Sequence, residues 1–62
     1  MTATIDFHRG TFYVSVFRGT QRVEYRRGDY RDVIGFAVGM GVPRREVTLT
    51  PAAQSAAMGV AR

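Results

Sequence analysis

Cysteine and tryptophan are absent from this chain of 62 residues, and proline occurs only twice. Without cysteine the chain has no disulfide scaffold, thiolate metal site, iron–sulfur cluster or thiol nucleophile. Small secreted domains usually depend on disulfides, so we expect a reducing, cytoplasmic location. Residues 1–6 show neither a basic region nor an apolar run, and no uncharged stretch, residues 33–43 included, reaches the about 20 residues of a membrane helix. We therefore expect neither a secretory signal nor a membrane partner.

Lysine is also absent, because all nine basic residues are arginines. Phosphate-binding loops with a GK[ST] ending and Schiff-base enzymes both need lysine, so these classes are excluded. The arginines outnumber five acidic residues and give a net charge of +4. Their planar guanidinium groups suit phosphate and carboxylate groups, so an acidic partner fits the charge.

A chain of this length is expected to form one domain that buries only roughly 60% of its unfolded surface. We assign residues 1–50 to a single α+β domain and residues 51–62 to an alanine-rich C-terminal helix or frayed tail. Because so small a core is thin, we expect self-association or a protein partner that covers apolar surface.

Apolar and polar residues alternate in three N-terminal segments, which is the signature of half-buried strands. The segments are residues 3–8, 11–18 and 21–27, and the pairs Arg9-Gly10 and Gly19-Thr20 separate them. Two-residue loops at these pairs predict a meander of two hairpins.

The loop lengths also predict a register. The first hairpin places Ile5 opposite Val14, and the second places Val14 opposite Tyr25 and Val16 opposite Val23. In this register one face of the sheet is apolar and buried, and it consists of Ile5, Phe7, Phe12, Val14, Val16, Val23 and Tyr25.

The period changes after Gly28, and apolar residues at helical spacing predict a helix over residues 30–40 with Asp29 as its N-cap. Gly35 and Gly39 within it indicate either close packing on the sheet or a weak helix. Gly41 ends the helix and Pro43 prevents its continuation. Residues 44–50 alternate again and predict a fourth strand. Thr50-Pro51 then resembles the start of the C-terminal helix.

The predicted architecture is β-β-β-α-β, a four-stranded, mostly antiparallel sheet with one helix on one face. The helix carries the chain back, so the fourth strand runs parallel to the first and third. A position beside the first strand gives the order 3-2-1-4, and we prefer it to a position beside the third. This order is similar to the opening half of ribonuclease-H-like folds, an analogy of topology that implies no function.

No residue constellation points to catalysis. His8 is the only histidine, and neither Ser15 nor Ser55 lies in a GxSxG context. Three carboxylates, Asp6, Asp32 and Glu46, resemble a metal set, but the register sends them to different layers. We therefore expect no catalytic residue, no metal, no cofactor and no small-molecule substrate.

The face of the sheet turned away from the helix is the candidate binding surface. The predicted register pairs Phe17 with Arg22, Ser15 with Glu24, and Tyr13 with Arg26 on this face. Such aromatic and arginine side chains favour protein–protein binding or self-association. The alternative is a nucleic-acid surface on which bases stack and phosphates meet arginine. The candidate binding residues are Tyr13, Phe17, Arg18, Arg22 and Arg26.

Overall fold

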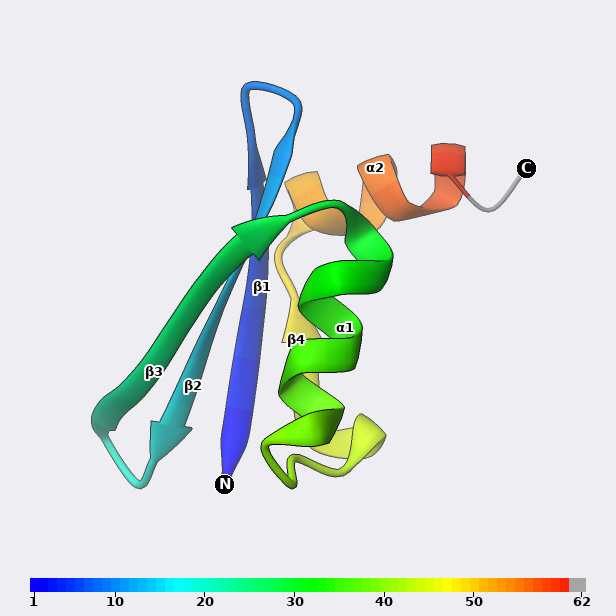
Figure 1. The fold of residues 1–62 in the computed structure, drawn as a ribbon. Helices are drawn as coiled ribbons and strands as arrows, with labels where there is room; N and C mark the ends of the chain where they lie inside the picture. Colours follow the sequence, from blue (N-terminus) through cyan, green and yellow to red (C-terminus); the bar gives the residue numbers. More distant parts are fainter. Residues whose placement is uncertain (61–62) are drawn as a thin grey trace.

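The computed structural model describes residues 1–60, which form a four-stranded sheet with two helices (Figure 1). The elements, in chain order, are β1 (Thr2–His8), β2 (Thr11–Arg18), β3 (Gln21–Gly28), α1 (Tyr30–Gly39), a 3-10 turn (Arg44–Glu46), β4 (Val47–Leu49) and α2 (Pro51–Val60). The sheet order is β3-β2-β1-β4, with β4 parallel to β1 and the other neighbours antiparallel. The predicted fold class and preferred strand order are therefore confirmed.

Both hairpin turns have the predicted two-residue length. Arg9 and Gly10 have positive φ angles of 51° and 80°, as a type I′ turn requires. In the second turn Gly19 is the residue with positive φ, 64°, which matches a type II′ turn. Turn geometry thus starts both hairpins in the expected register.

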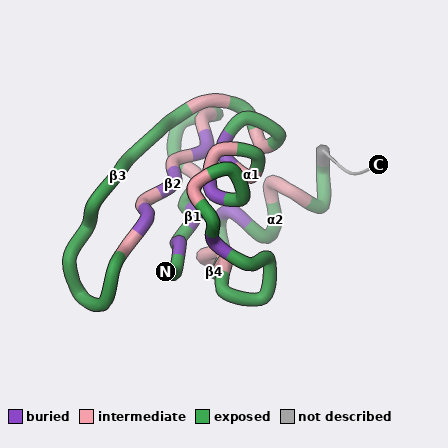
Figure 2. The backbone as a smooth tube through the Cα atoms, turned by 60° about the horizontal axis from the view of Figure 1, so that its bottom comes forward, coloured by how far each residue is buried: buried purple, intermediate pink, exposed green. Residues whose placement is uncertain are grey.

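The β1–β2 hairpin keeps the predicted register along its whole length. Ala3 pairs with Val16 and Ile5 with Val14, and these four side chains are at most 1% exposed. The core lies on this face, between the sheet and the two helices, where Ala37 of α1 and Ala53 of α2 are also fully buried. Figure 2 shows the alternation of buried and less buried positions along β2.

The β2–β3 hairpin departs from the predicted register after its second pair. Phe17 pairs with Arg22 as expected, but Val16 then pairs with Glu24, because Val23 is an extra residue in a β-bulge. The predicted pairs Val16–Val23 and Val14–Tyr25 are therefore wrong. Val23 and Tyr25 are 40% and 46% exposed and do not join the core.

Helix α1 has the expected caps. The Asp29 side chain accepts a hydrogen bond from the Asp32 amide at 2.9 Å, and Gly41, with φ 93°, turns the chain so that Val42 is buried. The prediction that Gly35 and Gly39 pack closely on the sheet is wrong. Both residues are exposed, and nothing lies within 4 Å of a Cβ built on either.

The fourth strand is shorter than predicted. Residues 44–46 form the 3-10 turn, in which the Glu46 amide donates to the Pro43 carbonyl at 2.8 Å, and the strand begins at Val47. Alternation of side chains in this segment does not distinguish a strand from a tight turn that follows proline. Within the strand, Thr48 is exposed and Val47 and Leu49 are half-buried, as expected.

A helix forms at the C-terminal end, so of the two alternatives for this segment the helix is correct up to Val60. The Thr50 hydroxyl caps it by accepting from the Ala53 amide at 3.2 Å, with Pro51 in the first turn. The last two residues of the predicted segment, 61–62, lie outside the described residues. Within residues 1–60, neither helix has the length and apolar content that crossing a membrane demands.

Candidate functional site

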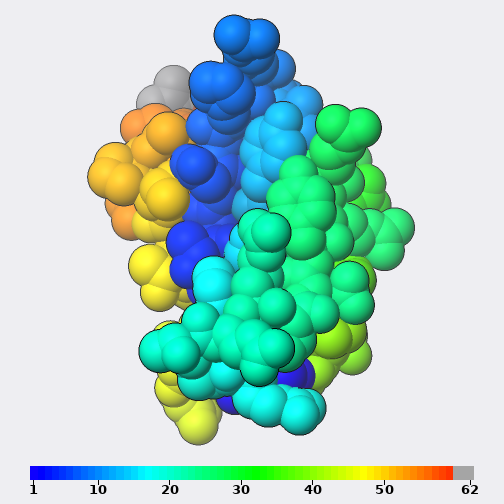
Figure 3. All heavy atoms as spheres, turned by 90° about the vertical axis from the view of Figure 1, so that its left-hand side faces the viewer, coloured from blue at the N-terminus to red at the C-terminus, as the bar shows by residue number. Residues whose placement is uncertain are grey.

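One face of the sheet is left uncovered by α1 and α2, and we call it the open face. Figure 3 views the molecule from this side, with β1 and β2 in blue and light blue and the side chains of β3 in blue-green. The pairing of the strands assigns its side chains, because paired residues share a face. From β1 and β2 these include Asp6, His8, Thr11, Tyr13, Ser15 and Phe17, and from β3 they are Arg22, Tyr25 and Arg27.

Two tyrosines from neighbouring strands stack on this face. The ring centroids of Tyr13 and Tyr25 are 6.2 Å apart and the ring planes differ by 29°. The Arg22 guanidinium lies 5.5 Å from the centroid of the Tyr25 ring, within the range of a cation–π contact. The face therefore offers aromatic rings beside a positive charge.

The bulge at Val23 decides which charges reach the open face. After it, Ser15 pairs with Tyr25 and Tyr13 with Arg27, so the predicted pairs Ser15–Glu24 and Tyr13–Arg26 are wrong. Glu24 and Arg26 instead share the face that the helices cover. One acidic side chain thus leaves the open face, while a tyrosine joins it and one arginine replaces another.

Arg26 illustrates the exchange. Its guanidinium lies 5.4 Å from the ring centroid of Phe36, which belongs to α1. Arg26 pairs with the fully buried Val14, which confirms that it lies on the helix side of the sheet. It is therefore separated from the aromatic pair that it was predicted to accompany.

The structure brings together three of the five candidate binding residues: Tyr13, Phe17 and Arg22. Arg18 is exposed at the end of β2, on the side of that strand's buried residues, and Arg26 lies beside α1. From the sequence, Tyr25 was assigned to the buried face and Arg27 was not counted among the five candidate binding residues. No single residue signals their position, since β3 has only two apolar side chains with which to fix its register.

Asp6 is the acidic residue that remains on the open face, and its carboxylate is engaged. Its Oδ1 accepts hydrogen bonds from the Thr50 hydroxyl and the Phe7 amide, both at 2.8 Å. These two bonds, with a smaller contribution from nearby His8, lower the pKa of Asp6 below its ordinary value of 3.8. Asp6 is therefore ionised at neutral pH and ties β1 to the start of α2.

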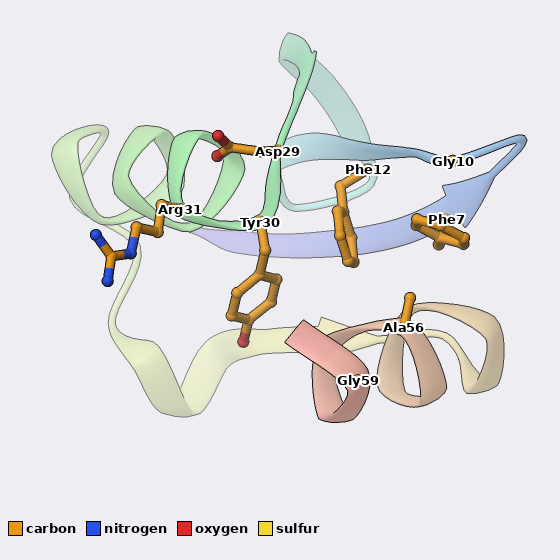
Figure 4. Close-up of a pocket in the computed structure, with 8 residues that line it drawn as sticks. All are labelled: Phe7, Gly10, Phe12, Asp29, Tyr30, Arg31, Ala56 and Gly59. Atoms are coloured by element: carbon orange, nitrogen blue, oxygen red, sulfur yellow. The ribbon is translucent and has the colours of Figure 1, made fainter. Parts of the chain in front are cut away.

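A second surface feature is an apolar cleft of about 570 Å³ between the β1–β2 turn, the start of α1 and helix α2 (Figure 4). Phe7, Phe12 and Tyr30 line it with ring-centroid separations of 4.7 Å and 5.3 Å between neighbours. The polar residues at its border point elsewhere: Asp29 caps α1, and Arg31 extends away from the aromatic rings. The cleft was not predicted from the sequence, and its lining offers mainly apolar contacts.

Comparison with known proteins adds nothing to this geometry. No family model, curated protein or solved structure matches the chain. Among the side chains of residues 1–60, no three from His, Asp and Glu gather closely enough to hold a metal ion, and the carboxylates of Asp6, Asp32 and Glu46 form no such group. The aromatic and arginine side chains of the open face are therefore the basis for its binding properties.

Proposed function

We propose that this protein is a non-enzymatic binding module that uses the open face of its sheet to hold single-stranded nucleic acid. The observation that carries the proposal is the Tyr13–Tyr25 stack with Arg22 over one ring. Exposed aromatic rings on a sheet stack with unpaired bases, and neighbouring arginines meet the phosphates between them. No cofactor is part of the proposal. The absence of cysteine supports a cytoplasmic location.

The distribution of charge on the open face supports an acidic partner, and among acidic partners the stacked tyrosine rings favour nucleic acid. Arg22 and Arg27 lie on the open face, whereas Glu24 points to the other side, and Asp6 is occupied by Thr50. A flat, sequence-independent contact is expected, because stacking and phosphate pairing both tolerate any base. Each stacked base contributes about 1–3 kcal/mol in proteins of this kind.

The test is fluorescence anisotropy of a labelled 15-nucleotide oligothymidylate over a series of sodium chloride concentrations. Arg22→Gln with Arg27→Gln should weaken binding at least about tenfold, and the slope of log affinity against log salt should fall by about 1.4, which is two phosphate contacts. The matched control, Arg44→Gln with Arg45→Gln, removes the same charge from the exposed 3-10 turn and should change binding less than about threefold.

Tyr25→Leu separates stacking from charge. It keeps an apolar side chain and the net charge, and should weaken binding roughly 5- to 150-fold, the equivalent of one stacked base. Equal losses in the two arginine double variants would show that only net charge matters and would overturn the proposal. Failure of the native chain to bind at low salt would overturn it as well and would leave the open face to a protein partner.

A further inference from the structure

Strand β3 forms an edge of the sheet and is long enough to pair with another strand. It spans Gln21–Gly28, whereas β4 at the opposite edge spans only Val47–Leu49 (Figure 1). Every residue of β3 before Gly28 is exposed, which Figure 2 shows as an uninterrupted green segment. The outer backbone N–H and C=O groups of such a strand are a template for a second chain.

The bulge leaves most of this edge regular. It lies at Val23, close to the Gly19–Thr20 turn, and from Glu24 to Gly28 the pairing with β2 proceeds without interruption. No proline interrupts β3. Proteins that keep their edges apart rely on charged side chains as well as bulges, so the charges on β3 decide whether two copies attract or repel each other.

Self-pairing of β3 permits few registers. When two copies are related by a two-fold axis perpendicular to the sheet, paired residues share a face, so the axis passes midway between the two copies of one residue. An axis at Glu24 opposes two acids, and an axis at Arg26 opposes two arginines. An axis at Tyr25 instead places Glu24 of each copy opposite Arg26 of the other, which gives two attractive cross-strand pairs.

We propose that the protein forms a two-fold dimer in which the β3 strands pair antiparallel about Tyr25 and join the two four-stranded sheets into one. The occupant of the β3 edge is thus a second copy of this chain, selected by its charge pattern. The Phe36 ring beneath the Arg26 guanidinium, 5.4 Å away, holds that side chain on the same side of the sheet as Glu24.

The dimer also has a consequence on the open face. There Tyr25 of one copy faces Tyr25 of the other, so the two Tyr13–Tyr25 stacks become one continuous aromatic row across the axis. Dimer formation does not require nucleic acid and does not rest on the proposed function. If both proposals hold, one strand of nucleic acid meets the platforms of both copies, and avidity strengthens binding.

The experiment is sedimentation equilibrium of the full chain without nucleic acid, over a hundredfold range of concentration. The native chain should reach twice the monomer mass. Glu24→Arg alone and Arg26→Glu alone each oppose like charges twice and should raise the dissociation constant at least about tenfold. The double variant reverses both pairs and should restore the dimer. Glu46→Arg, an equal charge change on the exposed 3-10 turn, should leave the mass unchanged.

The double variant separates a loss of strand pairing from a loss of folding, because a general effect of either substitution on folding is not repaired by the other. A native chain that stays monomeric throughout, single variants that dimerise as well as the native chain, or a double variant that stays monomeric would each overturn the dimer. A monomer that binds the oligonucleotide overturns the dimer alone. A dimer that fails to bind it overturns the proposed function alone.

Discussion

The two hairpins start from turns of equal length and end differently. In β1–β2 every pair follows the register that the turn sets, whereas in β2–β3 an extra residue, Val23, shifts all later pairs by one. The apolar residues of β1 and β2 that face the helices are buried or half-buried, and the residues of β3 before Gly28 are exposed. The turn therefore sets the register of the first pairs, and burial of alternate side chains keeps that register along the strands.

Inserting or deleting one residue in a strand provides the strongest test of this difference between the two hairpins. An alanine inserted between Asp6 and Phe7 turns Ile5 and Ala3 to the open face, since side chains alternate. The insertion should abolish the cooperative thermal transition seen by circular dichroism. Deletion of Val23 removes the bulge but keeps Glu24–Gly28 opposite the same residues of β2, so it should change the free energy of unfolding by less than about 1 kcal/mol.

The reverse outcome, a tolerated insertion in β1 and a destructive deletion in β3, would mean that β3 holds the register of the sheet. The control for the insertion is an alanine placed between Gln21 and Arg22, where no buried residue changes sides. That chain should still unfold cooperatively.

Two valines sharpen the comparison at the level of one side chain. Val14 of β2 is fully buried and Val23 of β3 is 40% exposed. Val14→Ala should lower the free energy of unfolding by about 2–3 kcal/mol, from lost burial and the cavity left behind. Val23→Ala should change it by less than about 0.5 kcal/mol. Urea denaturation with a shared slope measures both, and equal losses would show that the bulge residue packs as a core residue.

A smaller loss of stability than that of Val14→Ala is expected at the other edge of the sheet, where Thr50 links β1 to α2. Thr50→Val removes the hydroxyl that caps α2 and donates to Asp6, and should lower the free energy of unfolding by about 1 kcal/mol. Thr50→Ser keeps both hydrogen bonds and is the matched control. Asp6 should titrate closer to its ordinary value in the valine variant, as followed by NMR of its carboxyl carbon.

The pH dependence of stability follows from the same link. Because folding lowers the pKa of Asp6, its ionised form stabilises the native state above the ordinary pKa of 3.8, and this contribution disappears as the pH falls through the folded-state value. Asp6→Asn and Thr50→Val should therefore lose less stability than the native chain between about pH 5 and pH 2. Equal acid sensitivity in all three chains would contradict the assignment.

Much of the fold could be predicted from the sequence where side chains are buried in a regular pattern. Alternation located β1 and β2, Asp29 and Thr50 marked the two helix starts, and the parallel position of β4 followed from the connecting helix. The predicted start of the fourth strand was wrong. Residues 44–46, which follow Pro43, form a 3-10 turn that alternation alone does not reveal.

The candidate site was less predictable, for a reason that lies in β3. Strand β3 has only Val23 and Tyr25 as apolar residues, so its sequence pattern does not show which side chains face the helices. The bulge at Val23 determines this in the structure. Tyr13, Phe17 and Arg22 precede the bulge or lie on β2, and their placement was correct. Arg26 follows the bulge, and its placement was wrong for that reason.

The central position of β1 sets the order in which the molecule assembles during synthesis. β1 leaves the ribosome first, and its β2 neighbour is complete at Arg18, but its neighbour on the other side, β4, ends only at Leu49. At typical translation rates that interval lasts roughly 2 to 6 s, far longer than hairpin formation. For those seconds the strand that carries Ile5 has a free edge, so crowded nascent chains are exposed to pairing through β1 as well as through β3, whose edge stays open in the finished fold.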